Sequence, residues 1–209
     1  MINSRRFKVD NGELFIAYYE ENSELNLSFL PLSDEEKERL SKMKSTLRQT
    51  EFKLTRALLY SILPLEKIVY SDSGAPKLQF NSKKISISHS QKCVAIMLAH
   101  SDCGLDIELL DRDYLKISHR YLTNNDIKPL SNLEFALYWA TKEAIYKLAK
   151  GKDIDIFTDI SIKNIKYDNF TENSSGYIYV EVKKDPIKAY FLVEKGQVIV
   201  YSNKISSNN

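Results

Sequence analysis

Apolar residues along the chain fall into short runs that predict strands and into periodic stretches that predict helices. Residues 93–99, CVAIMLA, are apolar throughout, as expected of a strand that is buried on both faces. Other runs are rich in β-branched and aromatic residues, and they predict strands at residues 13–19, 84–88, 104–109, 160–167, 177–182, 188–193 and 197–201. We expect the last of these strands to pair with the one before it.

Two helices are predicted in the first third of the chain. Ser33 and Glu36 form a capping box, in which the hydroxyl and the carboxylate each satisfy a free backbone amide, so a helix is expected over residues 33–43. A second helix is expected over residues 50–63, because Pro64 disfavours the helical conformation in the residue before it.

A longer helix is predicted over residues 131–150. Ser131 and Glu134 form another capping box at its start, and Gly151 is placed to end it in a left-handed conformation. The order helix, strand, strand, strand then occurs both before and after about residue 102. We therefore predict an α+β fold with two similar lobes, residues 1–102 and 103–209, and an active site in the cleft between them.

Composition agrees with a folded globular protein and argues against two functional classes. Hydrophobic residues make up 43% and charged residues 28% of the 209 residues, which is ordinary for a chain that buries a core. The net charge of +2 lacks the strong basic excess of a dedicated nucleic-acid binder. No apolar run approaches the roughly 20 residues that span a bilayer, so we expect no membrane segment.

The N-terminus and the cysteines predict a cytoplasmic protein. Residues 1–21 have no apolar core and no small-residue cleavage site, so we expect no signal peptide. Cys93 and Cys103 have neither CxxC spacing nor the number needed for a disulfide framework. They are typical of free thiols in a reducing compartment.

Asp106 and Glu108 are two residues apart in the predicted strand GLDIE. Alternate side chains of a strand share a face, so both carboxylates should point one way while Leu105 and Ile107 point the other. Paired carboxylates on a rigid strand suit a hard cation such as Mg²⁺, which takes oxygen ligands. Any amphipathic edge strand shows the same alternation, and from this pair alone the plain edge strand is favoured.

The most informative segment is the sequence YWATKEAIYK in the third predicted helix. Trp139, Glu143 and Lys147 recur every four residues and therefore lie on one helical face. A solvated Glu–Lys pair would explain the charges but not the large aromatic side chain beside them. This face is therefore expected to be partly buried or to line a cleft.

Three further residues have both functional and plain interpretations. His89 lies between two serines at a strand end and could hold a phosphate as an imidazolium, but a turn histidine without function fits equally well. Arg56 could bind an anion or extend to the surface beside its helix. Asp126 follows Thr123 by three residues, which is the spacing of a simple cap.

Taken together, these motifs resemble those of the Sfp-type 4'-phosphopantetheinyl transferases. Residues 104–108, GLDIE, look like the family's G-[IV]-D-[IV]-E. Residues 139–147, WATKEAIYK, look like its W-[ST]-x-K-E-[AS]-x-x-K, although Ala140 and Thr141 do not place the hydroxyl where the family commonly has it. Residues 87–90, ISHS, are similar to its SHS element, and residues 56–59, RALL, to its R-x-L-L helix. Four motifs in this order and at these separations make the resemblance specific.

The resemblance implies a fold and a reaction. The fold is a pair of α+β lobes related by a pseudo-two-fold axis. The reaction is Mg²⁺-dependent transfer of 4'-phosphopantetheine from coenzyme A to a serine of an acidic apo-carrier protein, with release of adenosine 3',5'-bisphosphate. Glu143 would be the base on the acceptor serine, or would position the water that does this. The metal ligands would be Asp106, Glu108 and Asp126.

The resemblance also assigns phosphate-binding residues. Lys142 and Lys147 would hold the pyrophosphate, which Asp106 would contact through the metal. The nucleotide end of coenzyme A would be bound by residues of the SHS element, of the R-x-L-L helix and of the turn GAPK, namely Ser88, His89, Arg56 and Lys77.

Two departures from the family pattern leave alternatives open. Asp126 stands where the family has glutamate, and Ala75 stands where a basic residue is usual. The main expectation is a monomeric, cytoplasmic transferase, either of broad substrate range or a narrow fatty-acid holo-carrier synthase. The alternative from another class is a module that binds coenzyme A or a carrier protein and has lost transfer activity.

Overall fold

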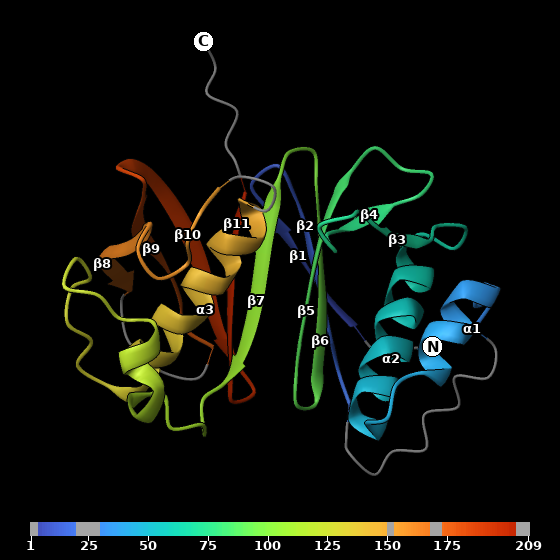
Figure 1. Ribbon diagram of the computed structural model, residues 1–209, viewed down its shortest axis with the longest axis horizontal. Coiled ribbons are helices and arrows are strands. Elements are labelled where there is room, and N and C mark those ends of the chain that lie inside the picture. The colour runs from blue at the N-terminus through green and yellow to red at the C-terminus, as the bar shows by residue number, and fades with distance from the viewer. Residues whose placement is uncertain (1–3, 20–29, 150–152, 168–172, 204–209) are drawn as a thin grey trace.

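The computed structural model describes residues 4–19, 30–149, 153–167 and 173–203, which form helices and antiparallel strands (Figure 1). The helices are α1 (Asp34–Ser41), α2 (Thr46–Ile62) and α3 (Asn132–Leu148), with the short 3₁₀ turn η1 (Leu115–Arg120). The strands are β1 (Ser4–Val9), β2 (Gly12–Tyr18), β3 (Ile68–Tyr70), β4 (Pro76–Leu78), β5 (Lys84–Ser90), β6 (Cys93–Ala99), β7 (Cys103–Leu109), β8 (Ile160–Tyr167), β9 (Ser175–Val182), β10 (Asp185–Glu194) and β11 (Gln197–Asn203).

Two main sheets organise the described residues. The N-terminal half forms a four-stranded sheet in the order β1-β2-β6-β5, and the C-terminal half forms a five-stranded sheet in the order β7-β11-β10-β9-β8. Strands β3 and β4 pair separately as a small ribbon. Figure 1 shows α1 and α2 on the outer side of the N-terminal half and α3 beside the C-terminal sheet.

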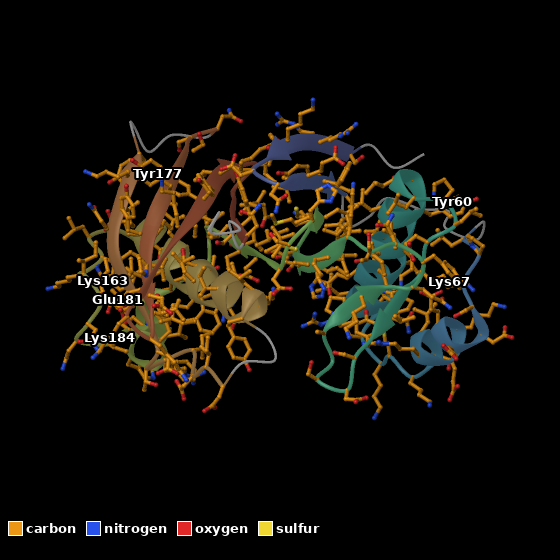
Figure 2. The ribbon with its side chains drawn as sticks, turned by 90° about the horizontal axis from the view of Figure 1, so that it is seen from above. Tyr60, Lys67, Lys163, Tyr177, Glu181 and Lys184 are labelled. Atoms are coloured by element: carbon orange, nitrogen blue, oxygen red, sulfur yellow. The ribbon has the colours of Figure 1, made fainter. Side chains whose placement is uncertain are left out.

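Three apolar clusters hold these layers together. One face of the N-terminal sheet packs against α2, and one face of the C-terminal sheet packs against α3. The third cluster lies between the two sheets, where Ile16 and Met97 meet Leu105 and Ile199. Every residue of β6 is buried, as the continuous apolar run predicts. In Figure 2, Tyr60 and Lys67 mark the outer end of one half, and Lys163 and Lys184 mark that of the other.

Strands β5 and β7 join the two halves through serine side chains rather than through a backbone ladder. Ser86 Oγ accepts a hydrogen bond from Leu105 N at 3.0 Å, and Ser88 Oγ accepts one from Ile107 N at 3.2 Å. On the other side of β7, a Cβ added to Gly104 would lie 1.9 Å from the Ala144 carbonyl oxygen of α3. The glycine of GLDIE is therefore needed for close approach between β7 and α3.

The predicted elements are present with shifted ends. All the predicted strands form, the last one pairs with β10 as expected, and the mixed architecture confirms the α+β class. The sequence patterns did not predict β1, β3 or β4. Helix α2 begins earlier than residue 50, because Ser45 accepts a hydrogen bond from Arg48 N and acts as its N-cap. The similarity of the two lobes and the boundary between residues 102 and 103 stay predictions.

The capping boxes differ in detail. Ser33 and Glu36 make both hydrogen bonds of the predicted box. Ser131 caps α3 as predicted, but the Glu134 carboxylate accepts from Leu130 N rather than from the Ser131 amide. The predicted helix end at Gly151 lies outside the described residues. No helix in the described part of the chain is long and apolar enough to cross a membrane.

Candidate active site

Strand β7 presents two carboxylates on the side that faces α3. Leu105 and Ile107 point into the core between the sheets, where they are 0% and 2% exposed. Asp106 and Glu108 point away from that core and contact side chains of α3. The predicted alternation is therefore confirmed, and β7 is not a plain edge strand, because both of its carboxylates are covered.

Asp106 is 5% exposed and has an incomplete set of hydrogen bonds. Its Oδ1 atom accepts hydrogen bonds from Lys147 Nζ at 2.7 Å and from Ser88 Oγ at 3.0 Å. Its Oδ2 atom is buried and has no hydrogen-bond partner among the described residues. A buried carboxylate oxygen without a donor is costly, so this atom is a ready acceptor for a ligand.

Glu108 is held rigidly by two aromatic side chains. Trp139 Nε1 donates to its Oε1 atom at 2.6 Å, and the Tyr114 hydroxyl donates to its Oε2 atom at 2.8 Å. Burial, followed by repulsion from Asp106, raises the pKa of the Glu108 carboxyl group. Tyr114 was not predicted to belong to the site, because no spacing in the sequence links it to Glu108.

The α3 stripe of Trp139, Glu143 and Lys147 faces β7. Trp139 contacts Glu108 and Lys147 contacts Asp106, so the first and last residues of the stripe each bind one carboxylate. Glu143 lies between them, and the structure records no hydrogen bond or ion pair between its carboxylate and any described side chain. Burial, followed by repulsion from Asp106, raises the pKa of Glu143. The stripe is therefore partly buried against β7, as expected, rather than a solvated face.

Asp126 and Lys142, which were predicted to bind the metal and the pyrophosphate, form a buried ion pair with each other. Lys142 Nζ lies 2.9 Å from Asp126 Oδ2, and their side chains are 0% and 1% exposed. Asp126 Oδ2 also accepts from Thr123 N and Oγ1, and its Oδ1 accepts from Ile162 N at 2.7 Å. Both oxygens are thus satisfied within the protein. The structure does not bring Asp126 to Asp106 and Glu108. Asp126 bonds to Thr123 with the spacing of the predicted cap, but residues 124–126 form a turn and no helix begins at Thr123.

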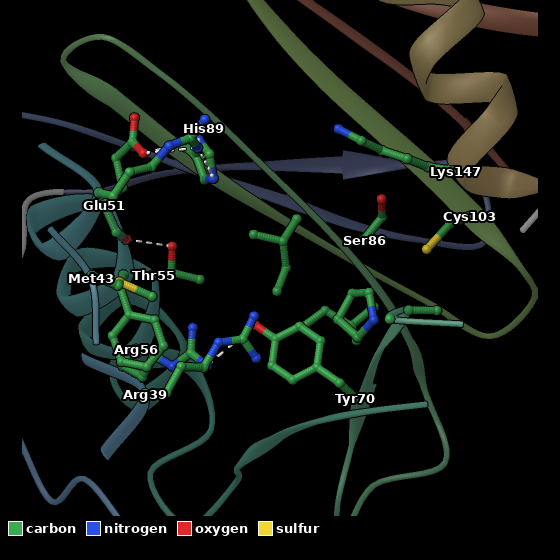
Figure 3. Close-up of a pocket in the computed structure, with 17 residues that line it drawn as sticks. Arg39, Met43, Glu51, Thr55, Arg56, Tyr70, Ser86, His89, Cys103 and Lys147 are labelled. Atoms are coloured by element: carbon green, nitrogen blue, oxygen red, sulfur yellow. Dashed lines mark hydrogen bonds and ion pairs between the residues drawn. The ribbon is translucent and has the colours of Figure 1, made fainter. Parts of the chain in front are cut away.

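A pocket of about 400 Å³ lies beside the carboxylate site, between the N-terminal and C-terminal halves (Figure 3). Its walls come from α1, α2, the β3–β4 ribbon, β5, β7 and α3. Lys147 reaches into this pocket from α3 while its ammonium group also holds Asp106. The basic side chains that line the pocket are Arg39, Arg48, Arg56 and Lys147.

Arg56 lies inside the pocket rather than at the surface, so the surface interpretation is wrong. Its guanidinium group lies 3.7 Å from the centre of the Phe52 ring, and the residue is only 8% exposed. Its Nε atom donates to Glu36 at 3.0 Å, and its Nη2 atom donates to the Tyr70 hydroxyl at 3.3 Å. These contacts orient a fixed cation toward the pocket.

His89 also lines the pocket, but it is not the imidazolium that the sequence suggested. Burial, with added repulsion from Arg48 and Lys147, lowers its pKa to about 4. The ring is therefore neutral at pH 7 in this structure. Its Nδ1 atom lies 3.3 Å from Glu51 Oε2, and its Nε2 atom lies 3.2 Å from Arg48 Nη1.

The two remaining predicted residues lie outside the pocket wall. Ser88 is buried and bonds to Asp106, so it positions the carboxylate. Lys77 is exposed on β4, while the preceding residues 74–76 line the pocket. Sequence reasoning also missed Arg48 and Glu51, which precede Arg56 on one face of α2. Their spacing of three to eight residues along a helix was the signal that could have identified them.

One family model matches the C-terminal part of the chain. Residues 102–201 match the family model of the 4'-phosphopantetheinyl transferase superfamily (ACPS). The matched region begins just before β7 and ends in β11, so it contains both the carboxylates and the α3 stripe. No curated protein gives a significant match to the chain. The superfamily match supports a transferase of the phosphopantetheinyl transferase kind.

The elements α1, α2 and β5, which line the pocket, come before residue 102 and therefore lie outside the region that matches the 4'-phosphopantetheinyl transferase superfamily. These elements carry Arg39, Arg48, Arg56 and His89. The superfamily match thus covers the carboxylate side of the site, and the N-terminal half adds the cationic side.

Proposed function

We propose that this chain is an Sfp-type 4'-phosphopantetheinyl transferase. It transfers the phosphopantetheine arm of coenzyme A to a serine hydroxyl of an acidic apo-carrier protein and releases adenosine 3',5'-bisphosphate. The observation that carries this proposal is the position of Lys147, whose ammonium group binds Asp106 and also lines the cationic pocket. If the diphosphate of coenzyme A binds Lys147, its nucleotide lies in the cationic pocket on one side of the lysine, and the β7 carboxylates lie on the other side.

The pocket fits the nucleotide end of coenzyme A. Arg56 and His89, which the family resemblance directs at the 3'-phosphate, are joined there by Arg48. Arginine suits this task because its planar, permanently charged group donates several hydrogen bonds to phosphate oxygens. The turn at residues 74–76 lines the same pocket and is the proposed neighbour of the adenine.

The residues of the carboxylate site fit a divalent cation. Asp106 Oδ2 lacks a donor among the described residues, and burial, followed by repulsion from Asp106, raises the pKa values of both Glu108 and Glu143. The described residues contain no cluster of three or more His, Cys, Asp or Glu side chains that could hold a metal by themselves. Asp106 and Glu108 would therefore hold Mg²⁺ together with oxygen atoms of the substrate, as this ion prefers. When bound, it neutralises charge on the pyrophosphate.

Side chains of the protein fill the remaining roles in the proposed reaction. Glu143, whose carboxylate has no hydrogen bond or ion pair with a described side chain, accepts the proton of the serine hydroxyl. Lys147 contacts the diphosphate and stabilises the charge that develops on the leaving adenosine bisphosphate. Trp139 and Tyr114 hold Glu108 in one orientation, and Ser88 does the same for Asp106. Asp126 and Lys142 support the site by fixing the turn at Thr123 to α3.

One chain supplies both sides of the proposed site, so we infer an enzyme that works as a monomer. The free thiols Cys93 and Cys103 fit a reducing cytoplasm.

The proposal is tested by incubating the chain with an apo-carrier protein, coenzyme A and Mg²⁺ and then measuring the intact mass of the carrier. We expect the carrier to gain one phosphopantetheine on its serine, and expect no gain when a chelator replaces Mg²⁺. A chain that binds coenzyme A but never changes the carrier mass would be a binding module instead.

A further inference from the structure

Glu51 is an acidic residue inside a pocket whose neighbouring charges are mostly positive. It lies on α2, and the residue is only 4% exposed. Its Oε2 atom lies 3.3 Å from Arg48 Nη1 and 3.3 Å from His89 Nδ1, and Figure 3 shows Glu51 and His89 together on one wall. The other charged or titratable groups of the pocket are Arg39 of α1, Arg56 of α2, Tyr70 of β3, Cys103 of β7 and Lys147 of α3.

The Glu51 carboxylate contacts the same donors that a phosphate would need. Arg48 and His89 can each donate hydrogen bonds to an anion, and in this structure both face Glu51. An anionic carboxylate and a phosphate dianion a few ångströms apart repel each other strongly where water is limited. A phosphate can therefore reach Arg48 Nη1 and His89 Nδ1, the two atoms that face Glu51, only if Glu51 moves away or loses its charge.

Protonation links this exchange to pH. Burial raises the pKa of Glu51, and burial with repulsion from Arg48 and Lys147 lowers the pKa of His89 to about 4. A bound dianion repels the Glu51 carboxylate and attracts a proton to His89, so it raises both pKa values. Binding of the dianion then takes up a proton, and its affinity falls as the pH rises.

We propose that Glu51 is a built-in counter-ion that occupies the phosphate position on Arg48 and His89, and that it yields this position to the 3'-phosphate of coenzyme A with uptake of a proton. This inference rests on the proposed function. It makes Glu51 a residue that lowers the affinity for the 3'-phosphate and sets how strongly the chain distinguishes coenzyme A from 3'-dephospho-coenzyme A.

The inference is tested by titration calorimetry on the full chain at pH 7.5, where a phosphate monoester with a second pKa of about 6 is a dianion. Measurements in two buffers of different ionisation enthalpy count the protons taken up. We expect uptake with coenzyme A and none with 3'-dephospho-coenzyme A. This count requires no variant, so equal uptake with both ligands, or no uptake with either, overturns the inference.

Glu51→Gln tests the same inference from the protein side. Removing the buried charge should tighten coenzyme A about tenfold and reduce proton uptake, while 3'-dephospho-coenzyme A should bind almost as before. The control is Glu35→Gln, which removes the same charge from an exposed position on α1 and should change affinity less than about twofold because solvent screens it. Weaker or unchanged coenzyme A binding by Glu51→Gln would mean that Glu51 only positions Arg48 and His89.

The two proposals fail in distinguishable ways. If the wild-type chain binds coenzyme A and modifies the carrier, but Glu51→Gln behaves like wild type, only the proposed role of Glu51 is refuted. Wild-type chain that binds neither ligand overturns the proposed function and this inference together.

Discussion

Helix α3 contributes a lysine to each of two aspartate–lysine pairs, and these pairs differ in their surroundings. Lys142 and Asp126 lie 2.9 Å apart with side chains that are 0% and 1% exposed. Lys147 and Asp106 lie 2.7 Å apart with side chains that are 29% and 8% exposed. Both pairs are short, so distance alone does not separate a structural pair from a functional one.

The two pairs differ in the hydrogen bonds that their aspartate oxygens accept. Both oxygens of Asp126 accept hydrogen bonds from the protein, from Thr123 and Lys142 on one side and from Ile162 on the other. Asp106 Oδ2 accepts none from the described residues. A carboxylate that is fully satisfied stabilises the fold, whereas one with a bare buried oxygen is prepared for a ligand.

The largest effect is expected at Glu143, which belongs to the Asp106–Lys147 side. Glu143→Gln should lower turnover by about 10²–10⁴, the usual contribution of a positioned base, and leave coenzyme A affinity unchanged. Steady-state kinetics of carrier modification, with calorimetry for affinity, measures both. Near wild-type turnover in Glu143→Gln would contradict the assignment of Glu143 as the general base.

The two lysines of α3 should respond in opposite ways. Lys147→Ala should weaken coenzyme A by about ten- to a hundredfold and slow turnover, because a charge-assisted contact to the diphosphate is lost. Lys142→Met should instead lower the free energy of unfolding by about 3 kcal/mol, because it leaves a buried carboxylate without its cation. Chemical denaturation and coenzyme A titration of both variants check this contrast, which would be refuted if Lys142→Met bound coenzyme A weakly while it unfolded normally.

The hydroxyl groups beside the two aspartates provide a finer test. Ser88→Ala removes a donor to Asp106 and an acceptor for Ile107 N, so it should cost about 1–3 kcal/mol of stability and also slow transfer. Thr123→Val removes a donor to Asp126 and an acceptor for Asn125 N, so it should cost about 1–3 kcal/mol of stability with no effect on transfer below the melting temperature. Equal rates in both variants would contradict the distinction between the pairs.

Most of the strands and the β7 carboxylates were predictable because their information is local. Alternation in β7 and the four-residue spacing on α3 place side chains on known faces before any tertiary structure is considered. Strand β1 was missed because none of its residues is fully buried and its sequence, SRRFKV, lacks a clear apolar pattern. Strands β3 and β4 have only three residues each, too few to show periodicity.

The partners of each charge were not predictable, because tertiary packing chooses them. Asp126 has the spacing of a cap and the position of a family ligand, and only the fold shows that Lys142 and Ile162 satisfy it. The neutral state of His89 likewise depends on burial and on Arg48, which lies 41 residues away in sequence. Motif spacing identifies candidates, but burial and hydrogen-bond partners determine what each one can do.

The most direct measurement compares Asp106→Asn with Asp126→Asn, using the rate of carrier modification per folded molecule and the free energy of unfolding. We expect Asp106→Asn to fold normally and to lose transfer by at least about 10²-fold, since charge stabilisation at the pyrophosphate is removed. We expect Asp126→Asn to lose about 3 kcal/mol of stability, since Lys142 remains buried and unpaired, and to transfer normally while folded. An Asp106→Asn variant that transfers at the wild-type rate would contradict the account.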